Sequence, residues 1–279
     1  MTFLVSVRPS NVESESWKLN RIPSSPLISV ITINLNSSTG LQETARSVDE
    51  QRYGKIEHIV QDGLSTDDSI RLISHEKTSN RQIFQEADNG IYDAMNKALL
   101  KVHGDLVIFL NAGDIFASQL VLAQVGQTYM EKDFLWAAGS VCPQSLIGYK
   151  RRKPLIGRNF FLLSLGLRIV PHPATFYSAR LLRQVGFFSP EMGLAADQHF
   201  ALRAWRIKPP LVLPLVVAIF DESGVSSRLT DHKRGIEFRQ IRRNLNLQFL
   251  RNDFLDLSLS LGIMGARRIV KGLRTCSRH

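Results

Sequence analysis

Four apolar runs in the first half of the chain are separated by segments with helical spacing, and this alternation constrains the fold more than any other feature. The runs are ISVITINLN, IEHIVQD, RQIFQEAD and DLVIFLN, and their β-branched and aromatic residues are typical of buried strands. A helix is predicted after the first run, with Thr39 as its cap and Leu41, Ala45 and Val48 on its apolar side. Strands alternating with helices predict an α/β fold, in which a mostly parallel sheet is covered by helices on both faces.

Polar residues follow these runs where the predicted strands end. The first run ends at Asn36, the second ends at Asp62, and the fourth continues into FLNAGDIF with Asn111 and Asp114. Ligands of open α/β sheets bind beyond the carboxyl ends of the strands, which share one rim. A single Asp at this rim is ordinary turn chemistry, whereas several in succession favour a binding site.

Asp114 and Asp62 each allow two interpretations from the residues alone. A strand-end carboxylate such as Asp114 can hold Mg²⁺ or Mn²⁺, and the ion in turn binds a diphosphate. Asn-Ala-Gly-Asp is also good turn composition. Asp62 can accept hydrogen bonds from a base or a ribose, or it can form a cap or an Asx-turn before the next helix, where Ser65 is equally suited to a cap.

Two further candidates lie in the second half of the chain, in HPATFYS and AADQHF. Asp197 opens a predicted helix in an apolar setting, where an unpaired carboxylate would be costly. It is therefore either a helix cap or a general base that takes a proton from a hydroxyl. His172, between two prolines, is a candidate ligand for a metal or a phosphate, although a lone His is more often structural.

Composition excludes several classes of protein. The chain has 279 residues, 44% hydrophobic content and two cysteines, which fits a globular protein of a reducing compartment without a disulfide framework. No secretory signal and no apolar run near the roughly 20 residues of a membrane helix are visible, so we expect a cytoplasmic protein. LVLPLVVAIF is too short to span a membrane and predicts a buried strand. P-loop, dinucleotide-binding, GxSxG and HExxH motifs are missing from the sequence.

From about Ile28 to Ser227, the order of these segments resembles the family 2 inverting glycosyltransferases of the GT-A type. EADNGIYDAMNKAL followed by GDLVIFLNAGDIF is the most specific part of the match, and it looks most like the colanic-acid type of exopolysaccharide transferases. The resemblance implies a GT-A-type, Rossmann-like fold and a nucleoside-diphosphate sugar as donor, with UDP-sugars and GDP-sugars both open. It also implies a divalent cofactor, Mn²⁺ or Mg²⁺, and a glycan or lipid-linked acceptor.

The resemblance also implies site residues, position by position. Asp114, the last residue of NAGD, matches the family's metal ligand, and Ala112 stands where a DxD motif has its first carboxylate. Asp197 matches the catalytic base, which implies direct displacement by an acceptor hydroxyl, with inversion and without a covalent enzyme intermediate. FDESGVSS, at 220–227, resembles a late loop near the active site. The residues implied to bind the donor or to face the same rim are Asn36, Asp62, Asp88, Asp93, Asn96, Asn111 and His172.

The last fifth of the chain carries most of the positive charge. From Arg228 onward there are twelve Lys and Arg against four Asp and Glu, an excess of eight within a net charge of +10. Apolar residues at 247, 250, 254, 257 and 261 form a helical stripe, accompanied by Arg239, Arg242, Arg243 and Arg251. Such a segment suits an amphipathic helix on the anionic inner face of the cell membrane, or a helix packed on the catalytic domain with its arginines in water.

Three parts are therefore predicted: a polar extension over 1–26, a catalytic domain over 27–227 and a basic amphipathic helical tail over 228–279. The predicted function is that of a metal-dependent, inverting hexosyltransferase of bacterial exopolysaccharide or surface-polysaccharide synthesis. The alternative is a non-catalytic protein that binds a nucleotide sugar or an anionic surface, because Ala112 lacks the first carboxylate. Nucleic acid is not an expected partner, since the basic tail has few aromatic residues and no recognised motif.

Overall fold

The structure, a computed structural model, describes residues 25–75, 80–146, 160–222, 231–252 and 254–262. The predicted N-terminal extension lies outside these residues except for its last two positions. The last five residues of FDESGVSS, 223–227, also lie outside them. The domain boundaries at 26 and 227 therefore stay predictions.

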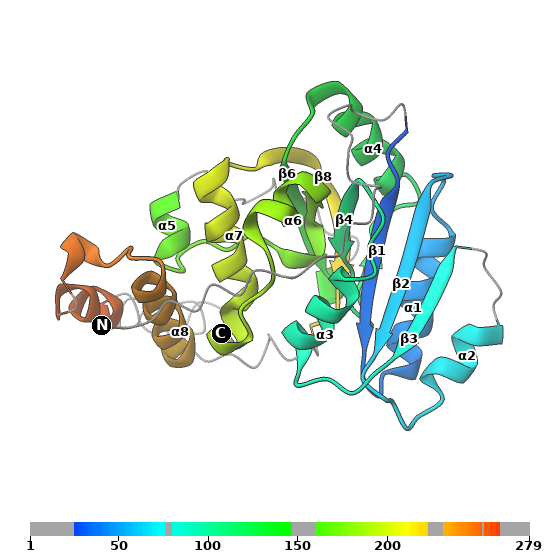
Figure 1. Cartoon of the computed structure of the whole chain (residues 1–279), viewed down its shortest axis with the longest axis horizontal. Helices are drawn as coiled ribbons and strands as arrows, with labels where there is room; N and C mark the ends of the chain where they lie inside the picture. The colour runs from blue at the N-terminus through cyan, green and yellow to red at the C-terminus, as the bar shows by residue number, and fades with distance from the viewer. Residues whose placement is uncertain (1–24, 76–79, 147–159, 223–230, 253, 263–279) are drawn as a thin grey trace, which may run out of the picture.

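The strands of the described chain form one sheet in the order β3-β2-β1-β4-β7-β6-β8-β5 (Figure 1). They are β1 (Ile28–Asn34), β2 (Ile56–Asp62), β3 (Arg81–Gln85), β4 (Leu106–Phe109), β5 (Ile115–Phe116), β6 (Trp136–Pro143), β7 (Thr175–Ser178) and β8 (Leu211–Phe220). β1 lies parallel to β2 and β4, β2 to β3, and β6 to β8. β7 runs antiparallel to β4 and β6, and β5 runs antiparallel to β8, so the sheet is parallel in its N-terminal half and mixed as a whole.

Helices cover both faces of the sheet, as predicted. They are α1 (Ser38–Asp49), α2 (Ser69–His75), α3 (Ile91–Leu99), α4 (Val121–Lys132), α5 (Phe160–Ser164), α6 (Ala179–Val185), α7 (Ala196–Ile207) and α8 (Asp231–Asn244). Successive side chains of a strand point to opposite faces. Ile31 and Ile33 therefore belong to the core cluster that includes residues of α3, α6, α7 and α8, whereas Ile28 and Val30 belong to the cluster that includes residues of α4 and the end of α1. Both faces of β1 are buried, which explains its continuous apolar run.

The first strand and the first helix end differently from the prediction. β1 ends at Asn34, and Asn36 has a left-handed backbone with φ of 51° in the connection to α1. α1 begins at Ser38, so the predicted cap at Thr39 is wrong. Ser37 occupies the cap position and makes no side-chain cap bond. The amide of Ser38 instead donates to the Asp67 carboxylate at 3.0 Å.

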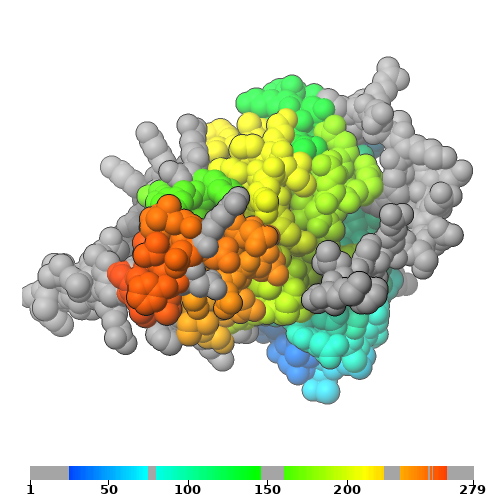
Figure 2. All heavy atoms as spheres, turned by 60° about the vertical axis from the view of Figure 1, so that its left-hand side comes forward, coloured from blue at the N-terminus to red at the C-terminus, as the bar shows by residue number. Residues whose placement is uncertain are grey.

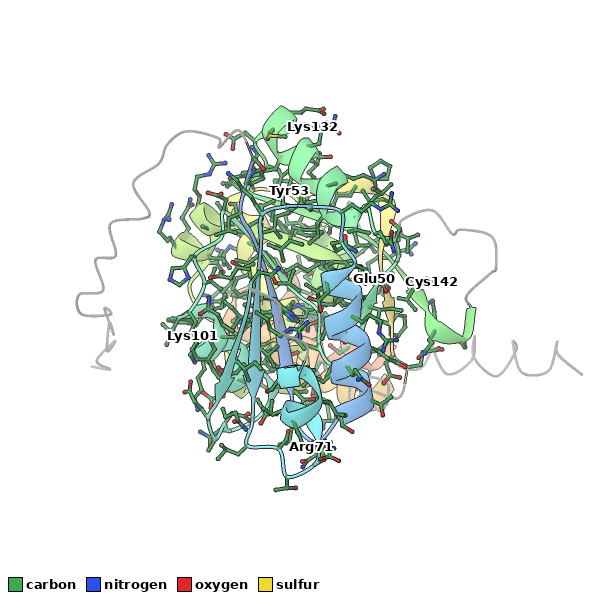
Figure 3. All side chains as sticks on the ribbon, turned by 90° about the vertical axis from the view of Figure 1, so that its right-hand side faces the viewer. Glu50, Tyr53, Arg71, Lys101, Lys132 and Cys142 are labelled. Atoms are coloured by element: carbon green, nitrogen blue, oxygen red, sulfur yellow. The ribbon has the colours of Figure 1, made fainter. Side chains whose placement is uncertain are left out.

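α3 begins at Ile91. It follows Gly90, whose φ is 107°. Asp93 lies in the first turn of the helix, where a carboxylate interacts favourably with the helix dipole. Just beyond the end of α3, Lys101 lies at the β2–β3 side of the sheet (Figure 3). Its ammonium donates to Gln61 at 2.9 Å and pairs with Glu86. These contacts fix α3 against β2 and the end of β3.

The C-terminal segment docks on the rest of the protein through a buried ion pair. Arg242 of α8 donates from Nε to Oδ1 of Asp256 at 2.7 Å, and the two side chains are 2% and 0% exposed. Arg242 also donates to the hydroxyl of Ser260 and to the carbonyl of Ser164 in α5. Residues 254–262 are helical, and Figure 2 shows this segment in orange beside α5 in green. The prediction of Arg242 as part of an outer basic face is therefore wrong.

Most of the apolar stripe in this segment is exposed. Leu250, Phe254 and Leu261 are 73%, 74% and 54% exposed, and Leu257 is 38% exposed. Leu247 packs partly against the main core. Beyond Leu247, the residues of the stripe are therefore exposed by 38% or more. None of the helices in the described ranges is long and apolar enough to cross a membrane.

Candidate active site

A cavity of about 550 Å³ lies at the carboxyl ends of β1, β4 and β8. This is the rim at which the strand ends predict a binding site. The predicted site residues that line the cavity are Asp88, Asn111, Asp114, His172 and Asp197. The predicted site residues that do not line it are Asn36, Asp62, Asp93 and Asn96.

The turn after β4 carries Asp114 to this cavity. The amide of Asp114 donates to the carbonyl of Asn111 at 2.9 Å, and Gly113 has the positive φ, 99°, that the turn requires. Thr44 of α1 holds the turn, because its hydroxyl donates to the carbonyl of Asp114 at 2.7 Å and accepts from the amide of Gly113 at 3.0 Å. The turn interpretation of NAGD is confirmed. Since the same turn presents Asp114 to the cavity, it does not compete with the metal interpretation.

The surroundings of Asp114 destabilise the ionised form of its carboxyl group. Burial raises the pKa of Asp114 to about 7. The amide of Asp221, the first residue after β8, donates to Oδ1 of Asp114 at 3.0 Å and lowers the pKa, whereas the negative charge of Asp221 raises it. A cation beside this carboxylate would therefore be favoured over an isolated negative charge.

The residues of the cavity fit a divalent cation that is shared with a ligand. In the described ranges, no three His, Cys, Asp or Glu side chains gather so that they could hold a metal by themselves. Asp114 and Asp221 both line the cavity, and the side-chain oxygen of Asn111 is buried there without a hydrogen-bond partner. Mg²⁺ and similar hard cations take oxygen ligands of this kind and complete their shell with phosphates and water.

His172 is the most clearly unsatisfied polar side chain of the cavity. It lies at the start of a short 3-10 turn (His172–Ala174) before β7, and it is 9% exposed. Neither ring nitrogen has a hydrogen-bond partner in the described structure. Burial lowers the pKa of His172 to about 4, so the ring is neutral at pH 7 and offers one donor and one acceptor nitrogen. A buried polar group without a partner is a candidate for ligand contact.

Asp197 lies in the first turn of α7, as predicted. Burial raises the pKa of Asp197 to about 6, while hydrogen bonds from Gln198 lower it. The amide of Gln198 donates to Oδ1 at 2.7 Å, and its side chain donates to Oδ2 at 3.1 Å. Tyr92 of α3 lies beside this carboxylate, and burial raises the pKa of Tyr92 well above 10. The site therefore holds a carboxylate that is more basic than an exposed one but ionised at neutral pH.

Asp62 closes a turn at the rim. Both of its oxygens accept from Ser65, the amide at 2.8 Å and the hydroxyl at 2.6 Å, and the side chain of Asn34 donates to it at 2.8 Å. The amide of Asn36 donates to the Ser65 hydroxyl at 2.8 Å, and Oδ1 of Asn36 accepts from the amide of Thr66 at 2.8 Å. The Asx-turn interpretation of Asp62 is thus realised in the structure, and its contact with a donor stays a prediction.

The three predicted residues around α3 have different positions. Asp88 lines the cavity and accepts from the amide of Gly90 at 2.9 Å. Asp93 accepts from the amide of Asn89 at 2.8 Å and pairs with a lysine of the next turn. The side chain of Asn96 bonds both backbone groups of Phe188, at 3.0 and 2.9 Å. Asp93 and Asn96 therefore hold local structure outside the cavity lining.

Asn34, Tyr92 and Asp221 are among the cavity residues that were not predicted as site residues. Asp221 follows β8, which is only partly buried, and lies in FDESGVSS, the segment that resembles a loop near the active site. The strand-end signal used for Asp62 and Asp114 could have singled it out. Asn34 requires the correct end of β1, two residues before the predicted one. Tyr92 has no such signal, because an aromatic residue on a helix is more often part of the core.

Comparisons with known proteins identify the family. The model of glycosyl transferase family 2 matches residues 29–186. An uncharacterized glycosyltransferase of Mycobacterium tuberculosis is 38% identical over 208 residues, which cover 73% of this chain and 78% of the relative. A PGL/p-HBAD biosynthesis glycosyltransferase of Mycobacterium bovis is 27% identical over 221 residues, which cover 74% and 81%. The chain belongs to glycosyl transferase family 2.

Solved structures of other proteins have a similar fold. TarS of Staphylococcus aureus in complex with UDP-GlcNAc has a TM-score of 0.65 and 19% identity, and the match covers 84% of this chain and 70% of that chain. The mannosyltransferase PcManGT from Pyrobaculum calidifontis in complex with GDP-Man and Mn²⁺ has a TM-score of 0.60 and 19% identity, covering 92% and 81%. The likeness shows the GT-A-type fold that the sequence predicts.

Proposed function

We propose that the protein transfers a hexose from a nucleoside-diphosphate sugar to a hydroxyl of a glycan or lipid-linked acceptor, with inversion at the anomeric carbon and with Mn²⁺ or Mg²⁺ as cofactor. The observation that carries the proposal is that Asp114 and Asp197 line one cavity, from the β4 turn and from the start of α7. The known complexes of TarS with UDP-GlcNAc and of PcManGT with GDP-Man and Mn²⁺ support a donor of this class.

Asp114 is assigned to the cation and His172 to the donor diphosphate. When bound, the divalent ion neutralises charge on the leaving diphosphate. His172 can donate one ring N–H to a phosphate oxygen, and Asn111 and Asp88 line the same space. Asn36 and Asp62 are assigned to the base or ribose at the rim. Asp93 and Asn96 are assigned to positioning α3, because their side chains bond neighbouring backbone.

Asp197 is assigned as the general base. It takes a proton from the acceptor hydroxyl as that oxygen attacks the anomeric carbon, and the bond from this carbon to the diphosphate oxygen breaks. The nucleoside diphosphate leaves with the bonding electrons, and the configuration inverts in one step. A pKa of about 6 suits this task, because the carboxylate is ionised at neutral pH yet more basic than an ordinary Asp.

We assign the transfer reaction to the synthesis of a surface or extracellular polysaccharide. We assign the protein to the inner face of the membrane. One relative is a PGL/p-HBAD biosynthesis glycosyltransferase. A putative teichuronic acid biosynthesis glycosyltransferase of Bacillus subtilis is 35% identical over 92 residues. The exposed stripe of Leu250, Phe254 and Leu261 lies in the most basic part of the chain. Apolar side chains within a basic segment are the composition that binds anionic lipid surfaces.

One observation favours a second candidate, a protein that binds a nucleotide sugar without turnover. Ala112 occupies the place of the first carboxylate of a DxD motif, so the turn after β4 supplies one carboxylate rather than two. The presence of Asp197 in the same cavity favours catalysis over this alternative.

A donor panel tests the proposal. Purified protein is incubated with UDP-sugars and GDP-sugars and Mn²⁺ or Mg²⁺, and release of nucleoside diphosphate is measured with and without bacterial lipid extract. We expect release from one donor that requires the metal and the extract and is lost in Asp197→Asn. Donor binding by calorimetry without release under any of these conditions would support the non-catalytic alternative. Absence of both binding and release would contradict the proposal as a whole.

A further inference from the structure

The carboxyl end of β8 brings a second carboxylate to the NAGD turn. β8 pairs antiparallel with β5, with Ile219 opposite Ile115, so the residue that follows β8 is placed beside the turn that precedes β5. That residue is Asp221, and its amide donates to Oδ1 of Asp114 at 3.0 Å. The two aspartates are 107 positions apart in sequence but share one wall of the cavity.

Gly113 shows how closely the side chain of Asp221 approaches this turn. A Cβ atom at position 113 would lie 3.1 Å from Oδ2 and 3.2 Å from Cβ of Asp221. Any larger residue at 113 would therefore press on Asp221, in addition to the strain imposed by a φ of 99°. The glycine leaves room for the carboxylate of Asp221 directly over the turn that presents Asp114.

An independent feature of the same cavity indicates a ligand. His172 is 9% exposed, lines the cavity, and has no hydrogen-bond partner for either ring nitrogen in the described structure. The side-chain oxygen of Asn111, at the start of the turn, is likewise buried and unpartnered. Buried polar groups are normally satisfied, so these atoms are expected to gain partners when a polar ligand is bound.

We propose that Asp221 is a second protein ligand of the divalent cation and replaces the carboxylate that Ala112 lacks. The inference rests on the proposed function, since it deepens the metal site of the same reaction. Two carboxylates from the ends of β4 and β8 provide the anionic oxygen pair that a hard cation prefers, and a diphosphate and water complete the shell. The motif is thereby split between two distant segments, which explains why NAGD alone carries a single carboxylate.

Mn²⁺ binding measured without any sugar transfer tests this inference. Free Mn²⁺ is followed by electron paramagnetic resonance during titration of the full chain, in the presence of GDP and, separately, of UDP. The variants are Asp114→Asn, Asp221→Asn and Glu222→Gln. Glu222 is a matched control, because it is the neighbouring acidic residue, is exposed, and accepts a hydrogen bond from the amide of Ser145 outside the cavity lining. Melting temperatures show that each variant is folded.

We expect Asp221→Asn to weaken Mn²⁺ binding at least tenfold and Glu222→Gln to change it less than twofold. As a second variant, Ala112→Asp is introduced into Asp221→Asn, and it is expected to recover at least part of the lost affinity, because it restores a carboxylate to the turn. Mn²⁺ binding that is lost in Asp114→Asn but unchanged in Asp221→Asn would overturn the inference while leaving the proposed function intact. Failure of the unmodified protein to bind Mn²⁺ with either nucleotide would overturn the metal part of the proposed function, and the inference with it.

Discussion

The imidazole of His172 stacks on the ring of Phe109, with ring centroids 5.0 Å apart and planes inclined by 27°. Phe188 meets the same imidazole edge-on, at 5.7 Å between centroids. The ring is thus held by aromatic contacts, whereas its two nitrogens have no protein partner in the described structure. Packing and ligand binding can therefore be separated by substitution at this one position.

Replacing His172 by Phe is expected to keep the packing and remove both nitrogens. We predict that the free energy of unfolding of His172→Phe lies within about 1 kcal/mol of that of the unmodified protein. Its donor affinity should be at least ~10-fold weaker, because a hydrogen bond to a charged group contributes about 1.5–3 kcal/mol. His172→Ala should lose donor binding and also about 2–4 kcal/mol of stability through the cavity it leaves. Urea unfolding and calorimetry distinguish the two effects. Unchanged donor affinity in His172→Phe would show that His172 does not contact the donor.

Asp114 is predicted to reduce the stability of the metal-free protein. Its pKa of about 7 in the folded state lies above the ordinary value of 3.8, so the native state holds the proton more tightly than the unfolded state. The free energy of unfolding therefore falls as pH rises from about 4 to about 7, and the cost is fully present above pH 7. With EDTA present, Asp114→Asn is expected to be about 1–3 kcal/mol more stable than the unmodified protein at pH 8, and by a smaller margin at pH 5. Equal margins at both pH values would show that the charge of Asp114 is not the cause.

The pH dependence of transfer is predicted to report Asp197. With saturating Mn²⁺ and donor, the rate should be flat above pH 7 and fall about tenfold per pH unit below pH 6, since only the ionised carboxylate can accept a proton. Gln198→Leu removes one of the hydrogen bonds that stabilise the ionised form, so the falling limb should move to higher pH. A limb that is the same in both proteins would assign the titration to another group.

The buried pair of Arg242 and Asp256 is predicted to hold the C-terminal segment in place. Asp256→Ala leaves a guanidinium that is 2% exposed without its carboxylate, and this typically costs about 3–5 kcal/mol. Ser258→Ala is the control, because Ser258 lies on the same helix but is exposed and donates to the carbonyl of Phe254 within that helix. We expect that control to change stability by less than about 0.5 kcal/mol. Similar unfolding midpoints for the two variants would show that the ion pair does not anchor the segment.

Membrane contact is predicted to depend on the exposed apolar side chains of the same segment. Phe254 and Leu261 are 74% and 54% exposed. Changing both to Gln should reduce sedimentation with vesicles that contain anionic phospholipid by at least ~5-fold, since burial of apolar side chains supplies part of such binding. Leu100→Gln serves as control, because Leu100 is 72% exposed at the end of α3. Equal sedimentation of the double variant and the control would contradict membrane contact through this surface.

The N-terminal half of the fold could be predicted from the sequence because its information is local. The strand runs and the helices between them in the β1–β4 region are visible in the residues themselves, and their alternation predicts parallel pairing with right-handed crossovers. The second half could not be predicted in this way. The insertion of β7 antiparallel between β4 and β6 depends on pairing between distant segments, which leaves no periodic signal in any one of them.

The site was predictable to a similar extent. Asp114 and Asp197 were found because each stands in a distinctive local sequence. Asn34, which lines the cavity, was not named, since the end of β1 at Asn34 rather than Asn36 cannot be read from a continuous apolar run. The Asp221 contact with the NAGD turn arises from the antiparallel pairing of β5 and β8, which joins segments 107 positions apart.

The most direct test of the central claim compares donor binding with transfer in Asp114→Asn and Asp197→Asn. Donor affinity is measured by calorimetry with Mn²⁺, and transfer is measured as nucleoside diphosphate release in the presence of acceptor lipid. We predict that Asp114→Asn loses most metal-dependent donor binding, whereas Asp197→Asn binds the donor as the unmodified protein does and transfers at least ~100-fold more slowly. Full transfer activity in Asp197→Asn would contradict the account.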